Sequence, residues 1–344
     1  TVTTAATGTG ALSYQWQSST TNIAGSFTNI AGATSATFDA PSGLTTTTYY
    51  QVISISTLNG VPCSATSNVI TVTINNVSAG VLSQTQTICS AGDAAAFTVT
   101  TAATGTGALS YQWQSSTTSN IAGFSDLLGA TLSTYNPPAG QTLTTYFRLI
   151  VTSTLNSIAC TSTSAVLTVF VNNVSPSVIA NNQTICSGGN PAAFTNTTAA
   201  TGTGALSYQW QSSTTNTAGS FTNIAGATSA TYDAPSGLTT TTYYQVISIS
   251  TLNGVPCSAT SNVITVTINN VSPSVIASNQ TICSGGDPTA FTVTTPATGT
   301  GALSYQWQSS TTSAAAGFSD IAGATNATYD APSGLTTTTY YQVI

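Results

Sequence analysis

The sequence contains 344 residues, and only 2% of them are charged: seven aspartates and a single basic residue, Arg148, which together give a net charge of −6. Nucleic-acid binding is excluded, because neutralising a phosphate backbone requires lysine and arginine side chains. We expect no enzyme activity and no catalytic residue, since the chain has no histidine, lysine or glutamate to act as a general base.

A unit of 97 residues recurs along the chain. The tryptophans keep this spacing at Trp16, Trp113, Trp210 and Trp307, and the cysteines keep it in two series, Cys63, Cys160 and Cys257, and Cys89, Cys186 and Cys283. Solenoid repeats are much shorter, about 20 to 50 residues, so this period predicts separate domains in a row. The predicted domains are residues 1–78, 79–175, 176–272 and 273–344, with the first truncated at its N-terminus and the last at its C-terminus.

The sequence begins and ends within a repeat. Thr1 corresponds to Thr98 of the next copy, and the final residues 340–344 correspond to residues 49–53 of the first copy. We therefore expect these 344 residues to be a segment of a longer polypeptide.

Short strands are predicted throughout each repeat. In the copy at 176–272, alternating or β-branched segments fall at residues 178–186, 193–198, 206–212, 221–224, 230–234, 242–250 and 263–269, separated by Gly, Pro, Asn and Ser clusters. Seven such strands indicate an all-β protein made of tandem Ig-like β-sandwich domains. No segment carries the 3.6-residue apolar stripe of a helix.

The alternation of apolar and polar residues predicts which faces are buried. Leu206, Tyr208 and Trp210 fall on one side of a strand, while serine and glutamine occupy the other. We therefore expect the four tryptophans to be core residues, as in an Ig-type sandwich, rather than exposed rings that stack on sugars. The second tyrosine of the Tyr243-Tyr244 pair is Phe147 in another copy, which predicts a buried ring whose hydroxyl is dispensable.

The six cysteines fit disulfides better than metal or redox sites, because they show no CxxC spacing. A bridge from Cys63 to Cys89 would have to span up to ~80 Å. We expect Cys89 to pair with Cys160, and Cys186 with Cys257, each closing a loop within one domain that contributes roughly 4 kcal/mol. In Ig topology these positions lie toward opposite poles, so the pairing requires a short or staggered first strand. The partners of Cys63 and Cys283 are expected outside the sequence.

No cofactor or metal site is predicted. Calcium needs several carboxylates among its oxygen ligands, whereas the repeat at 176–272 has Asp233 as its only acid and the chain contains no DxDxDG loop. We interpret Asp233 as a turn residue, and Gly202-Thr203-Gly204 as a loop between strands rather than a phosphate site. No run of 18 apolar residues occurs, so no membrane span is expected in this segment.

Five motifs carry a family resemblance: Cys186-Ser-Gly-Gly189, Tyr208-Gln-Trp-Gln-Ser-Ser213, Ile224-Ala-Gly-Ala-Thr228, Thr241-Thr-Tyr-Tyr244, and the segment from Cys257 to Ile268, CSATSNVITVTI. Together they resemble the Ig-like repeats of very large Bacteroidota surface proteins, over the whole chain. Such repeats are similar to the stalks of giant adhesins, including gliding-motility adhesins exported by the type IX system. The resemblance implies an extracellular, cell-surface location, which disulfides would also favour.

We expect a structural stalk or spacer of a large filamentous adhesin, with attachment or gliding carried by other parts of the chain. Short junctions such as Val171–Pro176 restrict bending, and sandwiches of about 40 to 45 Å each would form a rod on the order of 150 Å long. Two alternatives stay open. The repeats could themselves bind surface polysaccharide or pack against neighbouring copies in a fibre, or they could be the accessory stalk of a secreted enzyme.

Overall fold

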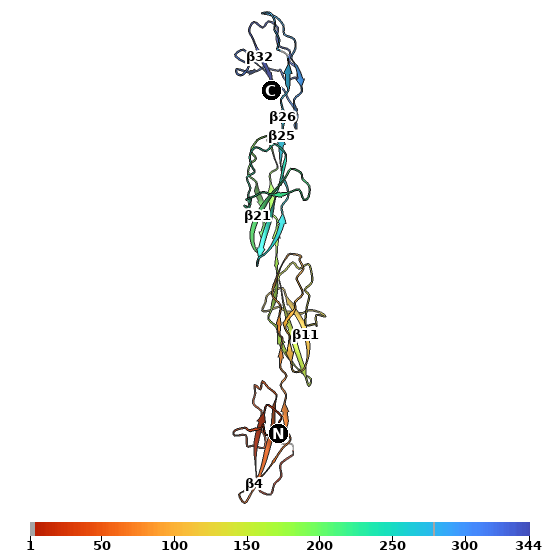
Figure 1. The fold of residues 1–344 in the computed structure, drawn as a ribbon, viewed down its shortest axis with the longest axis vertical. Helices are drawn as coiled ribbons and strands as arrows, with labels where there is room; N and C mark the ends of the chain where they lie inside the picture. The colour runs from red at the N-terminus through yellow and green to blue at the C-terminus, as the bar shows by residue number, and fades with distance from the viewer. Residues whose placement is uncertain (1–3, 278) are drawn as a thin grey trace. The chain divides into compact units, whose positions relative to one another are not determined.

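The structure is a computed structural model that describes residues 4–277 and 279–344. Its chain divides into two compact units, Thr1–Val171 and Asn172–Ile344, and each is described by itself. Every regular element of the described residues is a β-strand. The colour bar of Figure 1 allows the four repeats to be followed from red to blue.

The first unit contains the first two repeats. The strands of the first are β1 (Ala11–Ser19), β2 (Thr28–Asn29), β3 (Thr48–Leu58), β4 (Val61–Thr66), β5 (Ile70–Val72) and β6 (Val77–Ser78). Those of the second are β7 (Val81–Leu82), β8 (Gln86–Cys89), β9 (Val99–Thr101), β10 (Thr104–Gly105), β11 (Ala108–Ser116), β12 (Ser125–Asp126), β13 (Thr145–Leu155), β14 (Ile158–Thr163), β15 (Leu167–Asn172) and β16 (Val174–Ser175).

The second unit contains the third and fourth repeats. The strands of the third are β17 (Val178–Ala180), β18 (Gln183–Cys186), β19 (Thr195–Thr198), β20 (Thr201–Gly202), β21 (Ala205–Ser213), β22 (Thr222–Asn223), β23 (Thr242–Leu252), β24 (Val255–Thr260), β25 (Ile264–Asn269) and β26 (Val271–Ser272). Those of the fourth are β27 (Val275–Ala277), β28 (Thr292–Thr295), β29 (Thr298–Gly299), β30 (Trp307–Ser310), β31 (Ser319–Asp320) and β32 (Tyr340–Val343).

Each complete repeat is an Ig-like sandwich of two layers. In the third repeat the larger sheet has the order β18-β25-β23-β21-β22, with β24 also paired to β23, and the smaller layer is formed by β17 and β19 together with a bridge between Phe194 and Tyr232. The second repeat has the same order, β12-β11-β13-β15-β8. The all-β class and the tandem Ig-like sandwiches predicted from the sequence are therefore confirmed.

The first predicted strand, at 178–186, is broken in two. Its first half, β17, pairs antiparallel with β19, whereas its second half, β18, pairs parallel with β25 in the other sheet. The switch occurs at Asn181, which has a φ of 81°, a left-handed conformation that asparagine tolerates better than most residues. One strand therefore contributes to both layers and closes the edge of the larger sheet.

Two elements later in the repeat differ from the prediction. A strand was expected at 230–234, but only the Tyr232 bridge forms, because Pro235 lacks the N–H that a ladder needs. Conversely, β24 was not predicted. Its hairpin with β23 turns at Asn253 and Gly254, both with positive φ, and this Asn-Gly pair is the sequence signal of a two-residue turn.

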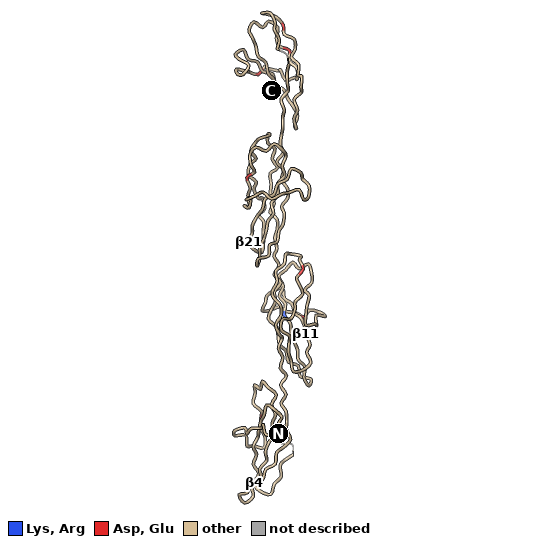
Figure 2. Tube along the Cα trace, viewed as in Figure 1, with Lys and Arg blue, Asp and Glu red and all other residues tan. Residues whose placement is uncertain are grey.

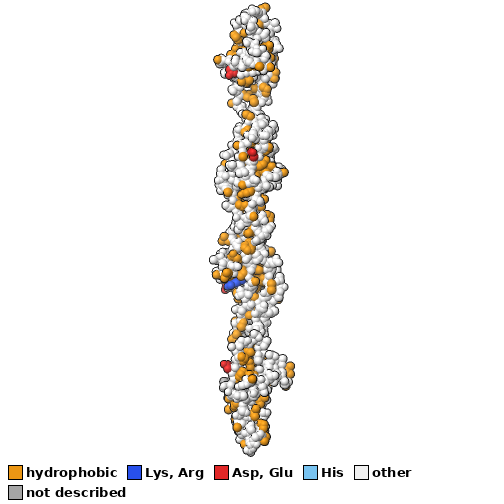
Figure 3. All heavy atoms as spheres, turned by 90° about the vertical axis from the view of Figure 1, so that its left-hand side faces the viewer, with side chains coloured by type: hydrophobic (Ala, Val, Ile, Leu, Met, Phe, Trp, Pro, Cys, Tyr) orange, Lys and Arg blue, Asp and Glu red, His pale blue; other side chains and the backbone are white. Residues whose placement is uncertain are grey.

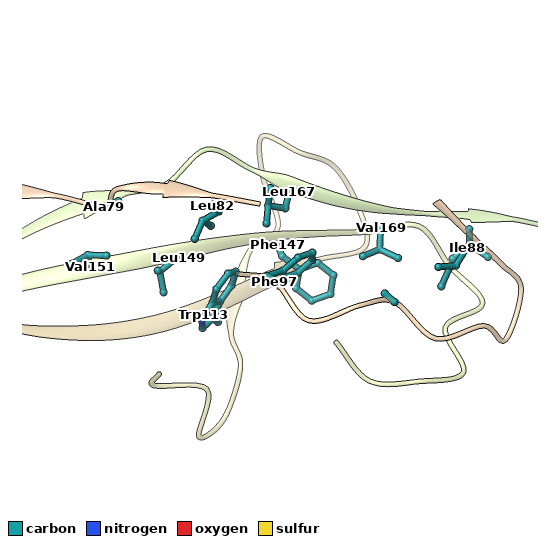
Figure 4. Close-up of a cluster of buried hydrophobic side chains, with 12 residues drawn as sticks. Ala79, Leu82, Ile88, Phe97, Trp113, Phe147, Leu149, Val151, Leu167 and Val169 are labelled. Carbon is teal, nitrogen blue, oxygen red and sulfur yellow. The ribbon is translucent and has the colours of Figure 1, made fainter. Parts of the chain in front are cut away.

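Aromatic rings form the centre of the core. In the second repeat, Phe97, Trp113 and Phe147 are buried. The centroid of the Phe97 ring lies 5.6 Å from that of Trp113 and 5.2 Å from that of Phe147. Aliphatic residues of β13 and β15 extend this cluster toward both ends of the repeat (Figure 4). In the third repeat, Phe194, Trp210 and Tyr244 form the same arrangement.

All four tryptophans, Trp16, Trp113, Trp210 and Trp307, are at most 3% exposed. Backbone carbonyls hold each ring: the Nε1 atom of Trp210 donates to the Ser229 carbonyl at 2.9 Å, and its main-chain N–H donates to the Ala227 carbonyl. Burial declines along the strand, because Tyr208 is half-buried and Leu206 is 39% exposed. The expected core face of β21 is thus buried only toward its C-terminal end.

The buried tyrosine of the third repeat makes stability depend on pH. Burial raises the pKa of Tyr244 to about 12, and the nearby Tyr232 adds to the rise. Because an unfolded tyrosine ionises near pH 10, the folded chain retains a proton that the unfolded chain loses. The resulting contribution to stability is complete below about pH 10 and is lost as the pH rises through about 12.

Tyr244→Phe should remove this dependence, since Phe147 fills the same position of the second repeat. Urea denaturation at about pH 9 and about pH 11.5 should show a larger loss of stability for the natural chain than for the variant. Equal losses in the two proteins would contradict the assignment.

Candidate functional site

Ionisable side chains are sparse, as the coloured trace of Figure 2 shows. Within the described residues, no group of three or more His, Cys, Asp or Glu side chains could hold a metal ion, and no helix could span a membrane. Arg148 lies over the ring of Phe124, with Cζ 4.1 Å from the centroid, and its Nε donates to Gln114. Nothing in these contacts resembles an acid–base pair.

The most elaborate polar arrangement lies where one repeat joins the next. In the second unit, the side-chain amide of Asn172 donates to the carbonyls of Ser250 and Val255 at 2.7 and 2.9 Å, on the two strands of the β23–β24 hairpin. Its Oδ1 accepts from the hydroxyl of Ser250 at 2.6 Å. Asn172 and Ser250 are both 0% exposed. The Asn172 amide nitrogen, its Oδ1 and the Ser250 hydroxyl therefore all have hydrogen-bond partners while shielded from water.

The residues after Asn172 continue along the third repeat. The main-chain N–H of Asn173 donates to the Thr203 hydroxyl at 2.8 Å, and the Asn173 carbonyl accepts from the main-chain N–H of Thr203 at 2.9 Å. Val174 and Ser175, which form β16, then pair antiparallel with β20. The junction segment is thus folded into the repeat that follows it.

The same contacts occur 97 residues earlier, within the first unit. Asn75 donates to the carbonyls of Ser153 and Ile158 at 2.7 and 2.9 Å and accepts from the Ser153 hydroxyl at 2.6 Å. At the third junction, Asn270 pairs with Thr300, but Asn269 is exposed and accepts only from the Thr300 hydroxyl. The described part of the fourth repeat has no counterpart of the hairpin that receives Asn75 and Asn172. We call this side-chain arrangement the junction clamp.

The cysteines do not pair as expected. Cys89 and Cys257 are each disulfide-bonded, whereas Cys63, Cys160, Cys186 and Cys283 are free. The predicted pairs Cys89–Cys160 and Cys186–Cys257 are therefore wrong. That Cys63 and Cys283 have partners outside the sequence stays a prediction.

Strand register explains why the pair within the third repeat cannot form. Cys186 lies opposite Asn269, the last residue of β25. Three residues earlier, Val266 of β25 faces Thr242, the first residue of β23, so Cys186 lies beyond the start of β23. Cys257 lies opposite Ser250, toward the other end of β23. At the rise of a β-strand these positions are about 35 Å apart, whereas a disulfide joins Cα atoms about 4 to 7 Å apart. The first strand is not staggered enough to bring the two cysteines together.

Sequence comparison identifies the repeat itself. The family described as "Domain of unknown function (DUF8696)" matches residues 1–76, 78–173, 175–270 and 272–344. The chain belongs to the DUF8696 family. No curated protein matches it significantly.

Solved structures similar to the DUF8696 chain include three N-terminal domains of the outer capsid protein Hoc of bacteriophage RB49, with 13% identity, a TM-score of 0.35, and coverage of 75% of this chain and 88% of that one. Titin domains A168–A170 share 13% identity with a TM-score of 0.32, over 64% of this chain and 74% of that one. Sidekick-1 immunoglobulin domains 1–5 share 13% identity with a TM-score of 0.23, over 86% of this chain and 60% of that one. At these TM-scores, the sandwich assignment rests on the strand pairings within each DUF8696 repeat.

The junction clamp can be tested with a matched pair of substitutions. Asn172→Ala leaves the Ser250 and Val255 carbonyls without their donor in a buried place and should cost about 2 kcal/mol. Asn269→Ala removes the equivalent exposed side chain and should cost less than about 0.5 kcal/mol. Native-state hydrogen exchange of the β23–β24 hairpin measures the difference, and equal exchange in both variants would contradict a stabilising clamp.

The cysteine assignment predicts the outcome of alkylation in denaturant without reduction. Cys63, Cys160, Cys186 and Cys283 should be labelled, and Cys89 and Cys257 should be labelled only after reduction, because thiolates react and disulfides do not. Peptide mapping by mass spectrometry reads each position. If Cys160 and Cys186 resisted labelling before reduction, the pairing expected from the sequence would regain support.

Proposed function

We propose that this segment is a structural spacer, whose repeats hold other parts of a large extracellular protein apart. The junction clamp is the observation that carries the proposal. Asn75 and Asn172 make the same three side-chain hydrogen bonds to the hairpin of the following repeat, so the second and third repeats each receive the preceding junction in the same way. Repetition of such a contact lets the chain grow by one domain at a time.

The near absence of ionisable groups also supports a passive role. Catalysis needs titratable groups placed near one another, and the described aspartates form no cluster with cysteines or with one another. The surface is covered by hydroxyl and amide groups, whose interactions depend little on salt. The segment therefore acts as a spacer and not as an enzyme.

An extracellular location fits the cysteines, because Cys89 and Cys257 are disulfide-bonded and disulfides persist in oxidising compartments. The motif resemblance extends the proposal to a cell-surface adhesin of the Bacteroidota, exported by the type IX system and serving attachment or gliding. In this role the adhesive ligand is bound by other domains.

A second candidate function rests on the surface of the second repeat. Four of its large aliphatic residues are more than 60% exposed, where the third repeat has alanine, serine or threonine at the equivalent positions: Ile121, Leu128, Leu132 and Leu143. Elsewhere, the face shown in Figure 3 has hydrophobic side chains scattered among polar ones. Exposed aliphatic side chains favour contact with a protein surface, so this repeat would pack laterally against a neighbouring copy in a fibre.

Small-angle X-ray scattering tests the spacer directly. An extended spacer of four domains should give a maximum dimension on the order of 150 Å, and Asn172→Ala should increase the flexibility seen in the scattering profile. A compact particle would overturn the spacer proposal. Growth of the apparent mass with concentration, abolished when Leu128 and Leu132 are replaced by the alanine and serine of the third repeat, would favour the lateral alternative.

A further inference from the structure

The outer face of the larger sheet carries a row of three hydrogen-bonded side chains. In the third repeat, Gln211 lies directly opposite Gln245 on one side and Asn223 on the other, so the row crosses β23, β21 and β22. The Nε2 atom of Gln245 donates to the Gln211 side-chain oxygen at 2.7 Å, and the Nε2 atom of Gln211 donates to the Asn223 side-chain oxygen at 2.8 Å. We call these three side chains, and their equivalents in other repeats, the amide row.

The amide row recurs along the chain. Its members in the first, second and fourth repeats are Gln51, Gln17 and Asn29; Arg148, Gln114 and Asp126; and Gln342, Gln308 and Asp320. The hydrogen bonds run in the same direction in all four repeats. Because the register of the strands places these side chains opposite one another on one face, the row is a fixed feature of the repeat.

An open cavity in the third repeat borders the amide row. Its volume is about 530 Å³, and its lining includes Gln211, Gln245, Phe221 and residues 216–219. Small-ligand sites commonly measure about 300 to 1,000 Å³ and combine apolar or aromatic surface with a few fixed polar groups. Phe221 is half-buried and supplies the aromatic surface, while the two glutamines supply the polar groups. The cavity therefore has the size and the chemistry of a ligand site.

The loop on the rim of the cavity is held by its own hydrogen bonds. The hydroxyl of Ser220 lies 2.8 and 2.7 Å from the carbonyls of Thr215 and Thr217, and its main-chain N–H donates to the Thr217 carbonyl at 3.1 Å. Gly219 has a φ of 82°, a left-handed conformation that glycine adopts without strain. A rim that is already ordered loses little conformational entropy when a ligand binds.

The second repeat shows what a longer side chain does at the same place. Phe124 corresponds to Phe221, and Arg148 corresponds to Gln245. The guanidinium of Arg148 lies over the Phe124 ring, with Cζ 4.1 Å from the centroid, in the arrangement of a cation–π contact. Glutamine is shorter and uncharged, and in the third repeat Phe221 borders a cavity instead. The ring face that a planar polar group covers in one repeat is thus open to a ligand in the other.

We propose that the cavity of the third repeat binds a neutral sugar unit of an extracellular polysaccharide. None of the described residues that line the cavity is ionisable, so a charged ligand would lose its hydration without gaining a counter-charge. The inference goes beyond the spacer function, because it gives an individual repeat a ligand of its own.

A sugar ring matches both kinds of surface in the cavity. Its C–H groups pack against an aromatic ring such as Phe221, and its hydroxyls both donate and accept hydrogen bonds. Within the described part of the chain, the amide row uses one N–H of Gln245 and one N–H of Gln211. Each glutamine amide has two N–H groups, so a second N–H on each, and the Gln245 oxygen, remain for the hydroxyls of the ligand.

NMR titration of the full chain tests this site, with cellohexaose, maltohexaose and xylohexaose as probes and the ¹⁵N side-chain amide signals of glutamine as the readout. At least one sugar should shift the signals of Gln211 and Gln245, with a Kd on the order of 1 mM or tighter. Gln245→Arg should weaken binding, read at Gln211, at least about tenfold, because the new arginine would cover Phe221 as Arg148 covers Phe124.

The second repeat supplies the matched control. In the natural chain the Gln114 signal should not respond to the sugar, whereas Arg148→Gln should uncover Phe124 and make Gln114 respond. Both substitutions exchange residues that the repeats already carry at this position, so both variants should unfold within a few degrees of the natural chain.

Three outcomes would overturn the sugar site: no response of Gln211 to any of the three sugars at about 10 mM, equal responses of the natural chain and Gln245→Arg, or equally tight binding of an acidic oligogalacturonate. Each of them leaves the spacer proposal standing, because the scattering test measures the dimensions of the chain and not its ligands.

Discussion

The position of the last strand is the constraint on which the rest of this fold depends. In the third repeat, β25 lies between β18 and β23, parallel to one and antiparallel to the other. This placement buries Ile264, Val266 and Ile268 over the aromatic core. It also fixes the direction in which the chain leaves the repeat, since Asn269 is the last residue of the strand.

The junction follows from that geometry. A chain that leaves at the end of the last strand reaches the next repeat without a linker, and two asparagines then supply the polar contacts. An asparagine side chain suits this task because its amide can donate twice while its oxygen accepts. At Asn172 all of these bonds are made in a fully buried place, where an unsatisfied group would be costly. Neutral hydrogen bonds therefore do at these joints what ion pairs do in more highly charged proteins.

The same strand explains where the cysteines lie. Parallel pairing with β25 places Cys186 at the opposite end of the sheet from Cys257, so the two cysteines of one repeat cannot meet.

The sequence by itself determined the 97-residue period, the all-β class and the burial of the tryptophans and of the Tyr244 ring, because these depend on local alternation and on comparison between copies. It could also have revealed the β23–β24 hairpin, whose Asn253-Gly254 turn is a local signal. Only the tertiary structure decided that β17 and β18 belong to different sheets, which cysteines are free, and that Asn172 is buried against a hairpin about 80 residues away. These features depend on which distant segments pair, and strand periodicity specifies the face of a residue but not its neighbour in the sheet.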